Sequence, residues 1–161
     1  MAYQTTWYFS GIPEDVVDLI EKEANEDSTI PEDSWIGGFV WHYILRANRE
    51  NFCFNLSHLD GDSLKFKVYN EGDKQTWHTD AKPIEEEEDV RKISFTVQLS
   101  EYDEYEGGNV QFLDEAGKTY FMPRARGCVA LFDSKANHRV EKVTKGTRKA
   151  LVGWCVGPRW K

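Results

Sequence analysis

The sequence contains little cysteine and no long apolar run. Its three cysteines, Cys53, Cys128 and Cys155, are widely spaced, and no Cys-x-x-Cys pair occurs. An odd number without paired spacing argues against a disulfide framework or a zinc–thiolate site and predicts a reducing compartment. No stretch of about 18 apolar residues is present, so we expect no transmembrane helix. Residues 1–5 lack a basic segment followed by an apolar one, so no signal peptide is predicted and a cytoplasmic location is expected.

Positive charge is also scarce. Lysine and arginine total 20 residues against 28 aspartates and glutamates, which gives a formal net charge of −8. Without a basic cluster, the chain does not have the composition of a nucleic-acid or anionic-membrane binder. The acidic run Glu85–Asp89 has the pattern of a solvated loop, and a lid that favours a basic substrate is the alternative.

What is present describes a globular chain. Its 161 residues are 40% hydrophobic and 14% aromatic, with no internal repeat and no linker-like segment. Aromatic side chains bury large areas, so an aromatic-lined interior is expected. We therefore predict a single domain over residues 1–161.

Two helices are predicted near the N-terminus. The first spans about Ile12 to Ala24, with Pro13 in its first turn and an apolar stripe of Ile12, Val16, Leu19, Ile20 and Ala24. In the second, the residues Ile36, Phe39, Val40, Tyr43, Ile44 and Ala47 form one continuous helical face.

The remainder of the chain has strand patterns. Ile93–Leu99 alternates strictly between apolar and polar residues. If the helices cover its apolar face, the polar residues Ser94, Thr96 and Gln98 must point inward; otherwise they form a wet face. Further strands are expected at residues 4–9, 52–56, 64–69, 76–79, 110–113, 119–121, 127–132, 139–143 and 149–156. Helices followed by about eight or nine short strands favour helices packed against a barrel or sandwich.

His78 and Asp80 are the first candidates for chemistry. On a strand, residues two apart point the same way, so both side chains can reach one metal ion. A lone His-x-Asp pair is a weak signal, because four histidines and numerous aspartates produce such spacings by accident.

His138 and Arg148 strengthen this interpretation. Two histidines and one carboxylate form the facial triad that suits non-haem iron(II), and this set leaves three coordination positions open. A 2-oxo acid would take two of them and dioxygen the third. The far carboxylate of 2-oxoglutarate would then need a cation, and the planar fork of arginine pairs a carboxylate bidentately.

The order of these residues resembles the prolyl 4-hydroxylase branch of the Fe(II)/2-oxoglutarate-dependent oxygenases. The similar segments, which cover about residues 64–156, are Tyr69-x-x-Gly72, His78-x-Asp80, Gly107–Phe112, Gly127–Phe132, His138-Arg139-Val140, Val143–Arg148 and Trp154. The resemblance implies a mainly β fold with a double-stranded β-helix (jelly-roll) core and two N-terminal supporting helices.

The resemblance also implies roles for individual residues. His78, Asp80 and His138 are the implied catalytic metal ligands, Arg148 the implied co-substrate cation and Tyr69 a co-substrate contact. Relatives with a second tyrosine carry it near the position of Gln98, so that contact is expected to differ here. The implied cofactors are Fe(II), 2-oxoglutarate and, as a further candidate, L-ascorbate.

The predicted activity is hydroxylation of a C–H bond by O2, coupled to decarboxylation of 2-oxoglutarate to succinate and CO2. A protein or peptide is the expected substrate. A small-molecule hydroxylase and a catalytically silent jelly-roll binding module are the alternatives, and nucleic-acid demethylation is disfavoured by the charge. Trp154 has the pattern of either a core or a pocket residue. Arg124 and Arg126 are expected to be surface charges, with contact to a substrate as the alternative.

Overall fold

The computed structural model describes residues 3–61, 63–81 and 89–160. Most of the acidic run, residues 85–88, lies outside the described part of the chain, and Asp89 begins a strand. The helices are α1 (Glu14–Glu26), α2 (Trp35–Ala47) and the short π-helix η1 (Asn48–Phe52). The strands are β1 (Thr6–Phe9), β2 (Thr29–Pro31), β3 (His58–Leu59), β4 (Ser63–Tyr69), β5 (Gln75–His78), β6 (Asp89–Gln98), β7 (Tyr105–Gly107), β8 (Val110–Leu113), β9 (Thr119–Phe121), β10 (Val129–Asp133), β11 (Asn137–Val140), β12 (Val143–Gly146) and β13 (Arg148–Pro158).

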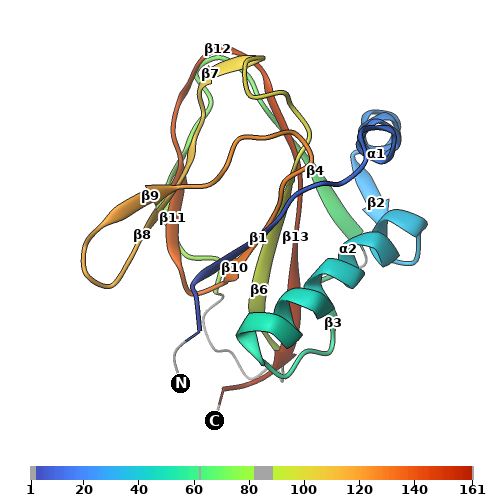
Figure 1. Ribbon diagram of the computed structural model, residues 1–161, viewed down its shortest axis with the longest axis vertical. Helices are drawn as coiled ribbons and strands as arrows, with labels where there is room; N and C mark the ends of the chain where they lie inside the picture. The colour runs from blue at the N-terminus through green and yellow to red at the C-terminus, as the bar shows by residue number, and fades with distance from the viewer. Residues whose placement is uncertain (1–2, 62, 82–88, 161) are drawn as a thin grey trace.

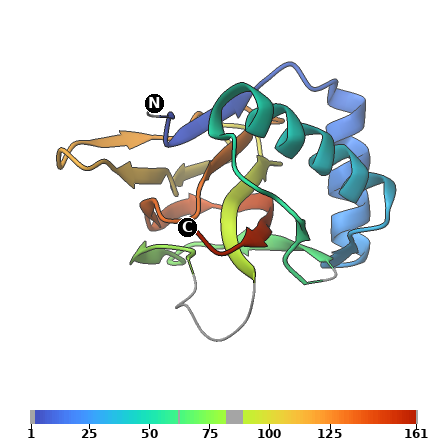
Figure 2. The same cartoon turned by 90° about the horizontal axis from the view of Figure 1, so that it is seen from below.

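The strands form two principal sheets that face each other (Figure 1). The larger sheet has the order β1-β10-β6-β13-β4-β2, with β3 added beside β13. The smaller sheet has the order β5-β11-β8-β9, and β12 pairs with β7 at one end of the molecule. Helices α1 and α2 lie against the larger sheet on the side away from the smaller one (Figure 2). The fold is therefore a jelly roll with two supporting helices, as the resemblance implied.

The predicted position of the first helix is confirmed, but its predicted apolar stripe is only partly buried. Pro13 is the N-cap residue, and Glu14 and Asp15 begin the helix where their charge opposes the helix dipole. The buried residues include Val17 and Ile20, whereas Leu19 is 52% exposed. The expectation that Leu19 is buried was wrong, because the buried stripe is rotated around the helix relative to the predicted one.

The second helix buries the predicted face. Ser34 caps it by accepting a hydrogen bond from the backbone N–H of Gly37 at 3.3 Å. Ile36, Val40 and Ile44 pack in the core between the helices and the larger sheet. Within the described ranges, no helix is both long and apolar enough to cross a membrane.

Strand β6 has two buried faces of opposite character. Ile93, Phe95 and Val97 belong to the core beneath the helices. Because side chains alternate along a strand, Ser94 and Thr96 point to the space between the two sheets. The helices cover the apolar face of β6, so its polar residues point inward, as the sequence predicted for that case. A second apolar cluster, which includes Phe112 and Phe132, fills part of the space between the sheets.

The predicted strand over residues 52–56 was wrong. The chain instead continues from α2 into η1, and Cys53 then adopts a left-handed backbone conformation with φ of 55°. The side chain of Asn48 accepts a hydrogen bond from the backbone N–H of Phe54 and donates one to its carbonyl. These bonds satisfy the backbone groups that a strand would have offered to a neighbour.

Candidate metal and co-substrate site

The two candidate histidine ligands lie opposite each other on neighbouring strands. His78 is on β5 and His138 on β11, and the antiparallel register of these strands pairs them directly. Their ring centroids are 4.2 Å apart. Asp80 follows β5 by two residues, and one potential ligand atom from each of the three residues lies within 4.8 Å of the other two. The structure thus brings together the three residues that the sequence singled out.

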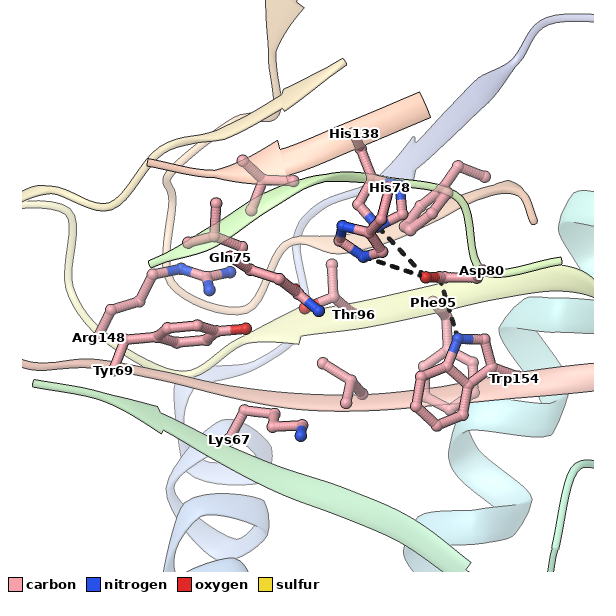
Figure 3. Close-up of a pocket in the computed structure, with 14 residues that line it drawn as sticks. Lys67, Tyr69, Gln75, His78, Asp80, Phe95, Thr96, His138, Arg148 and Trp154 are labelled. Atoms are coloured by element: carbon pink, nitrogen blue, oxygen red, sulfur yellow. Dashed lines mark hydrogen bonds and ion pairs between the residues drawn. The ribbon is translucent and has the colours of Figure 1, made fainter. Parts of the chain in front are cut away.

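Both imidazoles present the same nitrogen to this cluster. His78 Nδ1 lies 2.6 Å from the carbonyl oxygen of Thr76, and His138 Nδ1 lies 3.0 Å from that of Ala136. A carbonyl can only accept, so each Nδ1 carries the proton and each Nε2 keeps its lone pair. The two Nε2 atoms lie 3.4 and 3.5 Å from Asp80 Oδ1 (Figure 3). Three lone-pair donors therefore converge on one point.

Burial keeps His138 in the form that binds a metal. Its side chain is 7% exposed, and desolvation lowers the pKa of its imidazole, although the Asp80 carboxylate opposes that shift. A neutral imidazole is the ligand form of histidine.

The second carboxylate oxygen of Asp80 is held by two donors. Ser94 Oγ donates to Asp80 Oδ2 at 2.7 Å, and Trp154 Nε1 donates to the same oxygen at 3.0 Å. Both donors come from the inner face of the larger sheet, on β6 and β13. They leave Oδ1 directed at the imidazoles, and such outer contacts orient metal ligands in proteins. Trp154 is therefore a pocket residue.

A cavity of about 150 Å³ between the sheets contains this cluster. Arg148, the first residue of β13, also lines this cavity, and its side chain points into the cavity (Figure 3). Arg148 is only 3% exposed, and burial lowers the pKa of its guanidinium. Among the residues that the structure describes, no carboxylate forms an ion pair with it. A buried cation without an anion is costly, and an anionic ligand would supply the missing partner.

Two tyrosines flank Arg148. The Arg148 Cζ atom lies 5.3 Å from the centre of the Tyr69 ring. Tyr69 is on β4, which β13 separates from β6, and it also lines the cavity. Burial raises the pKa of Tyr69, so its hydroxyl stays protonated and can donate a hydrogen bond. Tyr105 of β7 lines a small pocket together with Arg148 and Gln98, and its hydroxyl accepts a hydrogen bond from Gln98 Nε2 at 2.9 Å.

The cavity wall also has an unsatisfied polar atom. Thr96 Oγ1 is buried and has no hydrogen-bond partner within the described ranges, and Thr96 lines the cavity between the metal cluster and Arg148 (Figure 3). Buried polar atoms are normally paired, so an orphan in a cavity wall points to a polar ligand. The donor set at one end fits Fe(II), and Arg148 at the other, which has no carboxylate partner among the described residues, fits one end of a dicarboxylate.

The two other histidines and Trp77 lie outside the cavity. His42 is exposed on α2 and His58 is exposed on β3, so neither reaches the cavity. Trp77 is outside the cavity, 39% exposed, with the Arg139 guanidinium 5.1 Å from its ring.

The expectation that Arg124 and Arg126 are surface charges was wrong. Arg124 donates to four oxygens around β7, including the carbonyls of Gly107 and Tyr105. Arg126 donates to the carbonyl of Leu99 and pairs with two carboxylates of α1. Each arginine joins segments that are distant in sequence, which the local pattern does not reveal.

Sequence reasoning gave no cavity role to Gln75 and Lys67, and it gave Ser94 an inward position only as one of two alternatives, without its bond to Asp80. Gln75 and Lys67 line the cavity, and Ser94 holds Asp80. The sequence held a signal for two of these residues, because Lys67 shares a face of β4 with Tyr69 and Ser94 shares a face of β6 with Thr96.

The fold and the site together define a class: jelly-roll proteins with a two-histidine, one-carboxylate cluster between their sheets. A family model described as the 2OG-Fe(II) oxygenase superfamily matches residues 64–156. That match covers more than half of the chain, and the chain belongs to this superfamily.

Individual relatives and solved structures agree with the family match. A PKHD-type hydroxylase of Crocosphaera subtropica is 30% identical over 141 residues, which cover 84% of this chain and 60% of that relative. A prolyl-4-hydroxylase of Pseudomonas putida superposes with a TM-score of 0.74 at 19% identity, covering 97% of this chain and 89% of that one. A prolyl hydroxylase of Trichoplax adhaerens, solved with a hypoxia-inducible-factor peptide fragment, superposes with a TM-score of 0.70 at 12% identity. The superposition covers 94% of this chain and 83% of that one. The chain thus spans less than two thirds of the length of the curated relative.

Proposed function

We propose that this protein is an Fe(II)- and 2-oxoglutarate-dependent dioxygenase that hydroxylates a C–H bond of a protein or peptide, in the manner of a prolyl 4-hydroxylase. The reaction would be coupled to decarboxylation of 2-oxoglutarate to succinate and CO2. One observation carries the proposal. The three converging ligand atoms of His78, Asp80 and His138 line the same cavity as the Arg148 guanidinium, which is buried and forms no ion pair with a carboxylate of the described residues.

His78, Asp80 and His138 would hold the iron. Two imidazoles and one carboxylate are the donor set that suits non-haem Fe(II). Iron and 2-oxoglutarate would supply the oxidising chemistry when bound, for which protein side chains have no equivalent.

Arg148 and Tyr69 would bind 2-oxoglutarate. A guanidinium pairs a carboxylate with two parallel hydrogen bonds, and burial strengthens that pair because little water competes. The protonated Tyr69 hydroxyl is available as a further donor. Thr96 Oγ1, which lacks a partner among the described residues, lies along the same wall.

The chain's own contribution is orientation and exclusion of water. The carbonyls of Thr76 and Ala136 fix the two imidazole rings, and Ser94 and Trp154 fix the Asp80 carboxylate. The apolar side chains Val110, Phe132, Val140 and Val152 complete the cavity wall. A reactive centre enclosed in this way meets the substrate before it meets bulk solvent.

The peptide substrate is supported by the solved neighbour that holds a peptide fragment and by the prolyl-hydroxylase relatives. The cavity also opens to solvent, because Gln75 and Lys67 at its wall are exposed. An extended chain could therefore place one side chain inside. L-ascorbate as a reductant and a cytoplasmic location stay predictions.

The test measures succinate formed from 2-oxoglutarate in the presence of Fe(II), ascorbate and O2. We expect succinate from the wild-type protein and loss of at least a hundredfold in the His138→Ala variant. His42→Ala is the matched control, because His42 is an exposed helix residue outside the cavity. Equal background succinate from all three proteins would contradict the proposal.

A further inference from the structure

We propose that Lys67 makes this site selective for a substrate that carries a carboxylate close to the carbon that is hydroxylated. The inference rests on the proposed function and names the substrate class for the same cavity. It depends on where Lys67 lies, on its lack of a partner and on the charge of the loaded site.

Lys67 belongs to the inward-facing side of β4. Side chains two apart on a strand share a face, so Lys67 points to the same side as Tyr69, and both line the cavity. Lys67 is exposed as well, which places its ammonium group where the cavity meets solvent. Figure 3 shows its side chain directed along the cavity wall towards Trp154, the residue that holds Asp80. A substrate entering towards the metal cluster would pass this ammonium group.

The positive charge of Lys67 has no protein partner in the described part of the chain. Its ammonium forms neither an ion pair nor a side-chain hydrogen bond there. Arg91 provides a contrast beside the same site: its guanidinium lies 4.0 Å from the centre of the Trp154 ring, but its Nε is paired with Asp60 at 2.7 Å. Of these two cations, Lys67 is the one available to an incoming anion.

The charge of the loaded site isolates Lys67 further. In a loaded site, Fe(II) and the Arg148 guanidinium together would balance the Asp80 carboxylate and the two carboxylates of 2-oxoglutarate. The ammonium of Lys67 then remains as the only uncompensated charge among the titratable residues that line the cavity in the described structure. A neutral or cationic substrate would leave that charge unpaired or repel it, whereas a carboxylate would pair with it.

A carboxylate could come from two sources. It could be the α-carboxylate of a free amino acid or related metabolite, or the side chain of an acidic residue next to the modified residue in a peptide. Both present the same group to Lys67, so the selectivity is one proposal and the experiment distinguishes the sources.

The experiment uses two matched pairs of compound pools with the full chain. The first pair is a set of N-acetyl amino acids with free carboxylates and the same set as primary amides. The second pair is a set of end-blocked peptides with glutamate at one fixed position and the same peptides with glutamine there. Products that gain one oxygen are counted by mass spectrometry, and succinate is measured in parallel.

The protein variants are Lys67→Gln, Lys67→Glu and the control Lys65→Gln. Lys65 is exposed and two residues earlier on the same face of β4, but it does not line the cavity. A second readout avoids turnover: the pools are equilibrated across a membrane with protein loaded with Mn(II) and 2-oxoglutarate, and the retained compounds are measured.

We expect the wild-type protein to oxidise and retain the carboxylate pool of one pair in preference to its amide counterpart. Lys67→Gln should reduce that preference about fivefold, because a partly exposed charge pair contributes modestly, and Lys67→Glu should abolish it. Lys65→Gln should match the wild type. A preference within the first pair of pools would indicate a free amino acid as the substrate. A preference within the second pair would indicate an acidic peptide.

Equal use of the acid and amide pools, or an acid preference that survives in Lys67→Glu, would overturn the inference. So would succinate formation without any oxidised or retained carboxylate compound. Absence of succinate and of 2-oxoglutarate binding is a different result, because it would remove the proposed function itself.

Discussion

Trp154 and Asp80 are joined by a hydrogen bond of 3.0 Å that connects the last long strand to the candidate metal cluster. The indole N–H occupies Asp80 Oδ2, while Oδ1 faces the two imidazoles. A tryptophan N–H can only donate, so this bond uses a lone pair of Oδ2 and fixes the rotation of the carboxylate. The bond therefore prepares Asp80 to offer a single oxygen to a metal ion.

Replacing Trp154 by phenylalanine should weaken metal binding about tenfold, the range found when the outer partners of metal ligands are removed. The substitution keeps an aromatic ring but removes the donor. Titration with Mn(II), followed by calorimetry, measures the affinity directly. Trp77→Phe is the matched control, because Trp77 is outside the cavity and 39% exposed. Unchanged affinity in Trp154→Phe would mean that Ser94 alone orients the carboxylate.

Arg148 allows a separate test of co-substrate binding. Arg148→Lys keeps a positive charge but loses the planar fork, so the KM for 2-oxoglutarate should rise about tenfold, and Arg148→Gln should raise it further. Thermal unfolding offers a readout without turnover: with Mn(II) present, 2-oxoglutarate should raise the Tm of the wild type and fail to raise that of Arg148→Gln.

The control for this prediction is Arg49→Gln, at an exposed arginine in η1. It should respond to 2-oxoglutarate as the wild type does. A full Tm increase in Arg148→Gln would assign the co-substrate cation to another residue.

The sequence predicted the local parts of this site because they depend on short periods. The two-residue spacing of His78 and Asp80 and the alternation along β6 follow from strand geometry alone. The meeting of His78 with His138 depends on β5 pairing with β11, which are far apart in the chain. Only the resemblance to a known family suggested that convergence in advance; spacing could not.

The errors have physical causes that act over a distance or through the backbone. Residues 52–56 contain aromatic and apolar side chains typical of a strand, but the Asn48 side chain bonds the backbone of Phe54, and Cys53 has a positive φ. In α1, Val17 and Leu19 are equally apolar, and the position of the sheet decides that Val17 is buried. Arg124 and Arg126 were misplaced because their partners lie on other segments.

The three cysteines should differ sharply in reactivity. Cys53 is exposed, whereas burial raises the pKa of the Cys128 thiol to about 11 and that of Cys155 to about 12. Thiolates are the reactive form, so at pH 8 iodoacetamide should modify Cys53 alone in the folded protein and all three in denaturant. Peptide mass spectrometry identifies the sites, and Cys53→Ser should leave the folded protein unmodified. Rapid modification of Cys155 in the folded state would indicate that the core beneath the helices opens.

Tyr105 should act on co-substrate binding through Arg148. Its hydroxyl accepts a hydrogen bond from Gln98 Nε2 at 2.9 Å, and the residue is 4% exposed in a small pocket that Arg148 also lines. Tyr105→Phe removes the bond from Gln98 and the hydroxyl near Arg148 while keeping the ring, so we expect a three- to tenfold rise in the KM for 2-oxoglutarate, little change in kcat, and a loss of about 1 kcal/mol in the free energy of unfolding. Tyr102→Phe, at a side chain 63% exposed, is the control and should change none of these. A fall in stability with an unchanged KM would make Tyr105 a packing residue, because only a positioning role links its hydroxyl to the affinity for a carboxylate.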